Sequence, residues 1–164
     1  MRRVVGSLSL SLDGRVNGPG GDYDMGWIVP HAVSDTARDH MIRVTAPATT
    51  ALLGRKNYQG FSGYWPGVAD DVNADPASEV RALRKADGGD IIVLASGSVI
   101  RALLAADEVD RLSITLCPAV SGGGARLFED GVPGSAWSLT DLSTADSGAI
   151  CLLYDRVREA GTDH

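Results

Sequence analysis

Apolar and small polar side chains alternate near the start of the chain. Leu8, Leu10 and Leu12 stand at every second position between serines, and this period of two predicts a strand over residues 4–12 with one face buried. A loop rich in glycine follows over residues 13–21. So many glycines favour a mobile loop that covers a ligand, and the alternative is an ordinary surface loop.

Helices and strands alternate along the rest of the chain. Ser34 is an N-cap candidate followed by an acid, which predicts a helix over residues 35–44. Asp75 followed by Pro76 marks a second helix start, because proline fits the first helical position. The remaining elements are expected as strands over residues 48–53, 91–94 and 112–116, a helix capped by Ser98, and two strands over residues 137–142 and 149–157 joined by the turn Ser147-Gly148.

This order of elements predicts one α/β domain over residues 1–164. The sheet is expected to be mostly parallel, with right-handed crossovers, and to close with an antiparallel C-terminal hairpin. Residues 91–94 form a continuous apolar run, which is typical of a strand buried on both faces of a parallel sheet. An apolar content of 44% in 164 residues is enough to build a core.

The turn Ala95-Ser96-Gly97-Ser98 carries the clearest functional signal of the residues themselves. It lies where a strand ends and a helix begins, and the first N–H groups of a helix lack partners and attract anions. Small side chains let a phosphate approach the backbone. The turn therefore predicts a nucleotide-type ligand, although α/β proteins without ligands also use small residues there.

The net charge of the chain limits the classes of molecule that it is expected to bind. The net charge is −6 and no basic run occurs, which argues against nucleic-acid binding. An anionic ligand then needs local positive charge, and Gly54-Arg55-Lys56 is the densest such spot at an element boundary. No apolar run is long enough to span a membrane, and the N-terminal alternation lacks a signal-type core. We therefore expect a cytoplasmic protein without membrane contact.

Cysteine and histidine give no metal signal. Cys117 and Cys151 stand among apolar neighbours in strand patterns, as reduced core residues do. The three histidines have no metal-ligand spacing with each other or with the cysteines. The sequence therefore predicts no metal site.

Four segments occur together in a fixed order. They are Ser11-Leu12-Asp13-Gly14, Gly54-Arg55-Lys56-Asn57-Tyr58, the turn Leu94-Ala95-Ser96-Gly97-Ser98 with its helix, and the stretch from Val109-Asp110-Arg111-Leu112 through Cys117-Pro118 to the glycine loop at residues 121–128. In this order they resemble the dihydrofolate-reductase-like superfamily, and within it the RibD C-terminal domain family, the reductase of riboflavin biosynthesis. The resemblance spans residues 4–155. It implies a three-layer sandwich, commonly a homodimer, that reduces a pteridine- or pyrimidine-type heterocycle with NADPH.

The resemblance implies that two turns and one glycine loop hold the dinucleotide. The turn at Gly54 would meet the cofactor phosphates, and the strand-to-helix turn at Gly97 would bind the pyrophosphate. Ser96 stands where dihydrofolate reductases have a glycine. The implied cofactor-binding residues are Gly54, Arg55, Lys56, Ser96, Gly97, Ser98, Val99, Ile100, Gly122, Gly123 and Gly124, with NADPH, or NADH, as the cofactor.

The resemblance also implies which residues contact the nicotinamide and the substrate. Asp13 belongs to the segment that borders the nicotinamide and the substrate, and the helix with Asp35 and Asp39 corresponds to the one that carries the acid contacting the pterin. A carboxylate there can hold ring N–H groups and assist protonation. The alternatives are that Asp13 only forms a turn and that both helix aspartates face solvent. Candidate substrate-binding residues are Leu12, Gly14, Trp27, Tyr58 and Trp65, whose aromatic rings would stack on a heterocycle or else fill the core.

One segment departs from the family pattern. Relatives place a helix and a strand between the motif Tyr64-Trp65-Pro66 and the helix that begins at Pro76, but here only GVADDVNAD intervenes, over residues 67–75. That strand helps to bind the adenosine ribose and its 2′-phosphate, and its loss would leave a gap or an unpaired edge in the sheet. Two hypotheses follow. The retained glycine turns favour a reductase, and the shortened segment favours a non-catalytic or cofactor-impaired dimeric relative with a ligand-binding or structural role.

Overall fold

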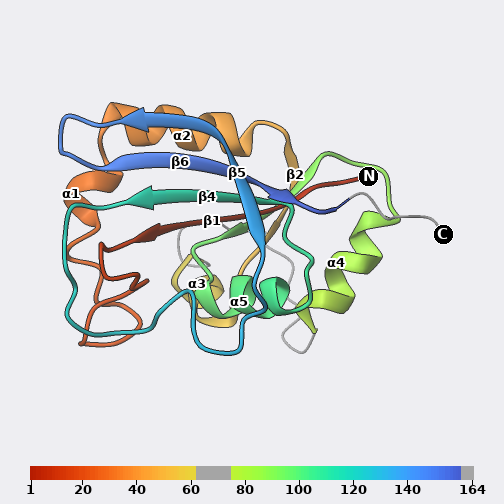
Figure 1. Ribbon diagram of the computed structural model, residues 1–164, viewed down its shortest axis with the longest axis horizontal. Helices are drawn as coiled ribbons and strands as arrows, with labels where there is room; N and C mark the ends of the chain where they lie inside the picture. The colour runs from red at the N-terminus through yellow and green to blue at the C-terminus, as the bar shows by residue number, and fades with distance from the viewer. Residues whose placement is uncertain (62–74, 160–164) are drawn as a thin grey trace.

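One six-stranded sheet organises the computed structural model, which describes residues 1–61 and 75–159. The strands are β1 (Val4–Leu10), β2 (Ala48–Leu52), β3 (Asp90–Leu94), β4 (Arg111–Leu116), β5 (Ala136–Thr144) and β6 (Ile150–Val157), in the spatial order β2-β3-β1-β4-β6-β5. The first four strands are parallel, and β6 runs antiparallel to β4 and β5 (Figure 1). The predicted α/β class with an antiparallel C-terminal pair is confirmed.

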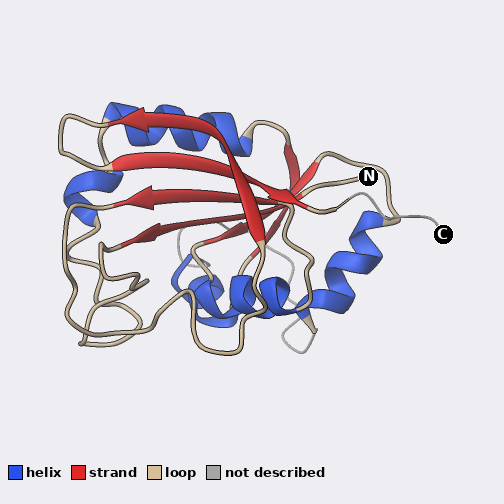
Figure 2. Ribbon diagram, viewed as in Figure 1, coloured by secondary structure: helices blue, strands red, loops and turns tan. Residues whose placement is uncertain are grey.

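Helices cover both faces of the sheet. They are α1 (Val29–Ala32), α2 (Asp35–Thr45), α3 (Arg55–Phe61), α4 (Pro76–Arg84) and α5 (Gly97–Ala105). On one face, Val44 of α2 packs against Val5 and Ile92. On the other face, Val80 of α4 and Ile100 of α5 join the larger core cluster. Figure 2 shows the strands as a layer between these helices, so the expected three-layer sandwich is confirmed.

A glycine on β1 brings α5 close to the sheet. A Cβ atom at Gly6 would stand only 3.2 Å from the side chain of Ile100, so a larger residue there would require Ile100 to shift. Ile100 is fully buried in this contact. The first turn of α5 is thereby fixed at the carboxyl end of β3.

The observed elements correct two expectations and add one helix. β1 ends at Leu10 rather than Leu12, because Ser11 turns the chain by accepting the Arg15 N–H on its hydroxyl oxygen at 2.9 Å. The helix that Ser98 was expected to cap begins at Gly97, with Ser96 at the N-cap position. The short helix α1 was not predicted, because its four residues bury no side chain and so leave no apolar period in the sequence.

The shortened segment over residues 67–75 was expected to leave a gap or an unpaired edge in the sheet. β2 pairs directly with β3, so the expected gap does not exist at this point. β2 is the last strand on its side of the sheet among residues 1–61 and 75–159. Nearly all of the segment 67–75 lies outside the described residues, and so does Trp65. Within the described ranges, no helix combines the length and apolar character needed to cross a bilayer.

Candidate functional site

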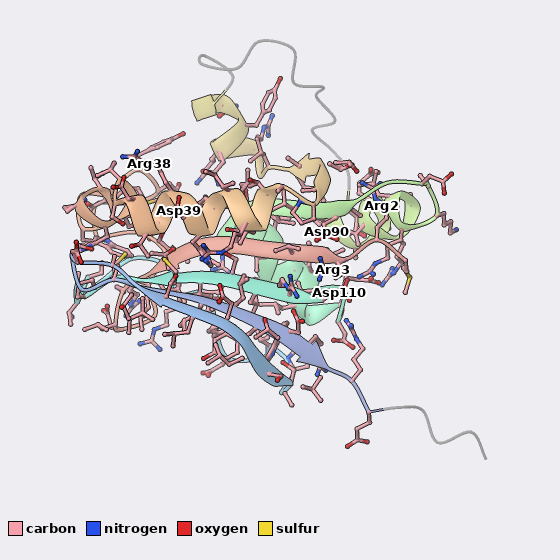
Figure 3. All side chains as sticks on the ribbon, turned by 90° about the horizontal axis from the view of Figure 1, so that it is seen from above. Arg2, Arg3, Arg38, Asp39, Asp90 and Asp110 are labelled. Carbon is pink, nitrogen blue, oxygen red and sulfur yellow. The ribbon has the colours of Figure 1, made fainter. Side chains whose placement is uncertain are left out.

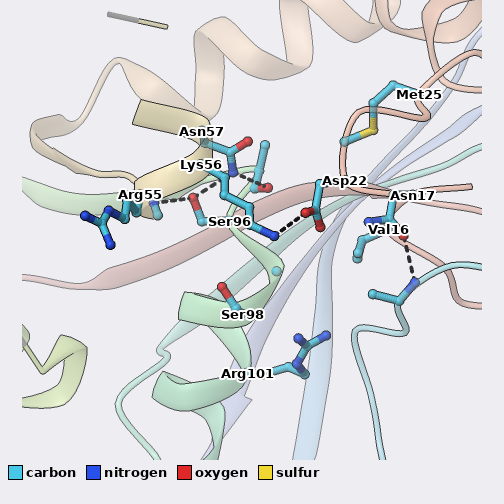
Figure 4. Close-up of a pocket in the computed structure, with 14 residues that line it drawn as sticks. Val16, Asn17, Asp22, Met25, Arg55, Lys56, Asn57, Ser96, Ser98 and Arg101 are labelled. Atoms are coloured by element: carbon cyan, nitrogen blue, oxygen red, sulfur yellow. Dashed lines mark hydrogen bonds and ion pairs between the residues drawn. The ribbon is translucent and has the colours of Figure 1, made fainter. Parts of the chain in front are cut away.

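A cavity of about 420 Å³ opens at the carboxyl ends of β2 and β3 (Figure 4). Open α/β sheets bind ligands at this edge. Four separate parts of the chain contribute to the wall, so both predicted phosphate-binding turns meet in one space. The lining residues are Val16, Asn17, Asp22, Met25, Gly54, Arg55, Lys56, Asn57, Ala95, Ser96, Gly97, Ser98, Arg101 and Ala125.

The hydroxyl of Ser96 joins the two turns. It donates to the Leu94 carbonyl oxygen at 2.8 Å and accepts the Gly54 N–H at 2.7 Å. It also accepts from the Asn57 side-chain amide at 3.1 Å. Ser96 is only 2% exposed. Ser96 stands where dihydrofolate reductases have a glycine. Its hydroxyl group therefore links the end of β3 to the turn after β2 by hydrogen bonds.

This use of Ser96 leaves the N-terminus of α5 without a side-chain cap. Ser96 is the N-cap residue, but its side chain accepts no hydrogen bond from α5. In the described part of the chain, the N–H groups of Gly97, Ser98 and Val99 have no recorded partner. Unpaired N–H groups at a helix start attract anions. The cavity therefore has donors in its wall that an anionic ligand would satisfy.

The charges of the cavity differ from those of the whole chain. Three cationic side chains and one carboxylate line it, whereas the chain carries a net charge of −6. Lys56 forms an ion pair with Asp22, which raises the pKa of Lys56. Arg101 donates to the Arg126 carbonyl oxygen and lies 3.7 Å from a carboxylate oxygen of Glu129, which is outside the lining. Arg55 is exposed and has no ion pair in residues 1–61 and 75–159. The local positive charge suits a phosphate group.

Asp13 lies outside the lining and ties two loops together. Its carboxylate accepts from the Ser11 hydroxyl at 2.6 Å, from the Ser121 N–H at 2.9 Å and from the Gly122 N–H at 3.0 Å. These bonds, that of Ser11 first, lower the pKa of Asp13 to about 2. The turn-forming alternative describes what this carboxylate does in the structure, and its catalytic role stays a prediction.

The three glycines of the glycine loop are also absent from the lining of the cavity. A Cβ at Gly124 would stand 2.3 Å from the Asn17 carbonyl oxygen, and one at Gly123 would stand 2.9 Å from Pro19. Gly124 has a φ of +96°, which side chains rarely adopt. Gly122 has a φ of +76° and meets the carboxylate of Asp13. These glycines support the loop that lines the cavity, and their direct contact with a cofactor stays a prediction.

Two of the expected cofactor residues point elsewhere. Ile100 is 0% exposed and Val99 packs against the same core cluster, so neither side chain reaches the cavity. The helical period explains this orientation, because positions 100, 103 and 104 of α5 face the sheet while Ser98 and Arg101 face the cavity. A contact of the Val99 and Ile100 backbone with a cofactor stays a prediction.

The helix aspartates are both exposed and neither lines the cavity. The buried positions of α2 are Ala37, His40 and Val44, which leaves Asp35 and Asp39 on other faces of the helix. Asp35 pairs with Arg38 at 3.5 Å, and Figure 3 shows Arg38 and Asp39 on α2. The solvent-facing alternative agrees with their exposure, and a substrate contact stays a prediction.

The expected substrate residues that the structure describes, which exclude Trp65, do not line this cavity either. Leu12 is 60% exposed, and Gly14 forms the turn after β1 with a φ of +75°. Trp27 is half-buried, and its indole N–H is buried without a partner. Tyr58 is half-buried on α3. Their assignment to substrate remains a prediction.

Sequence reasoning missed several residues of the wall. Asp22 and Met25 come from a loop without any motif, and only the folded chain brings them to Lys56. Arg101 was predictable in principle, because it lies one helical turn after Gly97 and so shares its face. Asn57 stood in the quoted motif without a role. Its amide donates to the Ala95 carbonyl oxygen at 2.8 Å.

The sulfur and imidazole groups form no cluster. Across the residues that the structure describes, no group of three His, Cys, Asp or Glu side chains is placed to hold a metal ion. Cys117 and Cys151 are free, buried thiols. Burial raises the pKa of Cys117 to about 11, so this thiol is protonated at neutral pH.

Three known proteins show what this chain is similar to. A curated protein of Bacillus subtilis, "Uncharacterized protein YyaP", is 23% identical over 184 residues, which cover 93% of this chain and 94% of the relative. A pyrimidine reductase-like protein from Corynebacterium diphtheriae superposes with a TM-score of 0.73 at 16% identity, covering 96% of this chain and 93% of the other. A dihydrofolate reductase from Enterococcus faecalis, complexed with NADP(H), superposes with a TM-score of 0.63 at 15% identity, covering 94% and 96%.

The structural likenesses establish a dihydrofolate-reductase-like fold. The family follows from the sequence, since the profile of the RibD C-terminal domain matches residues 56–151. That stretch begins at Lys56 and contains the Gly97 turn and the glycine loop. The chain belongs to the RibD C-terminal domain family.

Proposed function

We propose that the protein is an NAD(P)H-dependent reductase that transfers a hydride to a pyrimidine- or pteridine-type heterocycle. One observation carries the proposal. The uncapped first turn of α5, Lys56 and Arg101 converge on a single cavity at the carboxyl end of the parallel strands. That combination fits the pyrophosphate of a dinucleotide.

Each part of the wall has a defined task in this proposal. The N–H groups of Gly97 and Ser98 donate to the pyrophosphate, and the absence of a side chain at Gly97 lets it come close. Lys56 and Arg101 supply positive charge, and Arg55 lies exposed at the same turn. The bound cofactor supplies the hydride, while the protein supplies orientation and electrostatics.

The substrate class is inferred from family and fold. The RibD C-terminal family match and the pyrimidine reductase-like and dihydrofolate reductase folds support a flat nitrogen heterocycle. The half-buried Trp27, with its unpartnered indole N–H, and Tyr58 are the candidates for stacking on it. We expect turnover with a member of this class and none with open-chain carbonyl compounds, measured as oxidation of the reduced nicotinamide.

Equilibrium titration with NADPH and NADH tests the cofactor site. Tryptophan fluorescence reports binding, because Trp27 stands two residues from Met25 in the lining. We expect saturable binding in the micromolar range. No binding at millimolar concentration by a protein that is folded by circular dichroism would overturn the proposal.

Gly97→Val tests the assignment of the turn. A Cβ there would stand 3.3 Å from Val16, so a branched side chain fills the space beside the helix start. We expect affinity for NADPH to fall by a factor of about 100 or more, because one turn of N–H donors becomes inaccessible. Gly134→Val is the matched control, since no atom lies within 4 Å of a Cβ at that exposed position. Unchanged affinity in folded Gly97→Val protein would refute the assignment.

A second function is favoured by the sequence of residues 67–75. The family resemblance implies that relatives have, at this point, a strand that helps bind the adenosine ribose, whereas this chain has a short acidic segment. The alternative is a non-catalytic or cofactor-impaired relative that keeps the fold. The same titration separates the two functions, because only the reductase requires saturable dinucleotide binding.

A further inference from the structure

Asp22 is the one carboxylate in the wall of the cavity, among the described residues. It pairs with Lys56, and Figure 4 shows the two side chains extended toward each other. Asp22 comes from the loop after β1, while Lys56 lies in the first turn of α3. The ion pair therefore joins the loop over residues 16–25 to the turn after β2, across the space that a ligand would fill.

The loop itself does not depend on Asp22. Its shape comes from backbone bonds, including Gly18 N–H to the Asp24 carbonyl oxygen at 2.7 Å. Asp24 adds a side-chain bond by accepting the Gly20 N–H at 3.0 Å. The only recorded bond of Asp22 is the one to Lys56. Replacing Asp22 therefore releases the loop from Lys56 without removing a bond that folds the loop.

The Lys56 ammonium group cannot pair equally well with the Asp22 carboxylate and with a ligand phosphate at the same time. An ammonium group is a compact charge, and a carboxylate that already holds it competes with a phosphate and repels that phosphate. The side chains of Lys56 and Asp22 are 66% and 48% exposed. Exposed ion pairs of this kind are weak, so an incoming phosphate can replace the carboxylate.

We propose that Asp22 sets the affinity of the cavity for phosphate, because its carboxylate occupies Lys56 until a dinucleotide phosphate displaces it. This inference rests on the proposed function and adds a residue that limits cofactor affinity. Displacement also frees the loop over residues 16–25 from the turn after β2. Cofactor binding and loop release are then one coupled event.

The experiment compares Asp22→Asn with two reference variants. Asp22→Glu keeps the competing charge. Asp87→Asn makes the same charge change at an exposed position just before β3, at the opposite end of that strand from the cavity. Calorimetric titration of each variant with inorganic pyrophosphate and with NADPH, at low and at high salt, gives the affinities. Hydrogen–deuterium exchange of residues 16–25 gives the state of the loop.

We expect Asp22→Asn to bind both probes about threefold to tenfold more tightly than the unchanged protein at low salt, with a smaller gain at high salt. Its loop should exchange faster without ligand, while the other two variants stay within about twofold of the unchanged protein.

Other outcomes separate the two claims. Equal or weaker binding by Asp22→Asn, when the unchanged protein binds NADPH, overturns the competition and leaves the cofactor site standing. Failure of every variant to bind either probe overturns the cofactor site and this inference together.

Discussion

At the scale of single residues, the pKa of the Asp13 carboxyl group distinguishes between two roles for this residue. The roles are donating a proton and holding the glycine loop in place. Its pKa is lowered to about 2 by hydrogen bonds from the Ser11 hydroxyl and the Ser121 and Gly122 N–H groups. A group with so low a pKa is ionised at neutral pH and is a poor proton donor there. The structure therefore favours a holding role, in which Asp13 fixes the glycine loop against the turn after β1.

A pH titration of Asp13 tests this. Because the folded pKa is depressed, its stabilising bonds are fully present above the unfolded value near 4 and are lost as the pH falls through about 2. Carbon NMR of the Asp13 carboxyl group should show a midpoint near 2. A midpoint at 4 or higher would contradict the bonding described and reopen the role of a proton donor.

The second prediction at this scale concerns Ser96. Ser96→Ala leaves the Gly54 N–H without its partner in a site that is nearly closed to water. We expect the free energy of unfolding to fall by about 1–3 kcal/mol, as for other buried groups that lose their partner. Urea denaturation measures this loss. The control is Ser98→Ala, which alters an exposed hydroxyl two residues away and should leave stability within about 0.5 kcal/mol. Equal stability of both variants would mean that the two turns hold together without Ser96.

At the scale of elements, much of the fold was predictable because many of the strands and helices have a recognisable pattern in their own residues. The alternation in β1, the apolar run of β3 and the caps Ser34 and Asp75 each determine one element, and the structure confirms both caps. The position of the α5 cap was wrong by two residues. Ala95 adopts a φ of +50° in the turn, so the helix begins earlier than the residue types indicate.

The helix α2 also carries a buried group that the sequence did not single out. His40 is 0% exposed, and its Nε2 lies 2.8 Å from the Ser113 hydroxyl on β4. Burial lowers the pKa of His40, an effect to which Arg43 adds and which Asp141 opposes. The imidazole is therefore favoured in its neutral form under the helix.

This makes stability depend on pH in a defined direction. A depressed histidine pKa means that the unfolded chain binds a proton first, so stability is full above about pH 6.5 and falls as the pH decreases below it. Urea denaturation of His40→Gln should lack this decline, and His31→Gln serves as the control. If His40→Gln loses stability between pH 8 and pH 5 as steeply as the unchanged protein, His40 is not the group responsible.

At the scale of the whole molecule, one face of the sheet is incompletely covered. A register shift between Leu139 and Asp141 turns β5 so that Leu139 and Leu142 oppose Tyr154 and Leu152. Leu139 is 48% and Leu142 is 53% exposed. Exposed apolar surface of this kind marks association sites. We propose that this face forms the homodimer that the family resemblance implies.

Light scattering after size exclusion measures the mass in solution. We expect the unchanged protein to elute as a dimer and Leu142→Arg to elute as a monomer, because a charge would be buried in the contact. Ser138→Arg is the control, since this exposed residue lies on the opposite face of β5. A monomeric unchanged protein, or a dimer that tolerates Leu142→Arg, would refute the assignment.

The candidate site was predictable only where contiguous residues form it. The turns at Gly54 and Gly97 stand out in the sequence, and the structure brings both to one cavity. Asp22 reaches the cavity through the folded arrangement of distant segments, so no local pattern indicates it, whereas Arg101 follows from its place one helical turn after Gly97. Ser96 shows a further limit of prediction from the sequence, because its hydroxyl accepts a hydrogen bond from Gly54, which lies 42 residues away in the chain.

The central claim is that this cavity is the dinucleotide site, and a crystal structure with NADPH tests it most directly. The account predicts a pyrophosphate within hydrogen-bonding distance of the Gly97 and Ser98 N–H groups, with Lys56 turned from Asp22 toward a phosphate. NADPH bound elsewhere on the protein, or a cavity left empty at saturating NADPH, would contradict the claim.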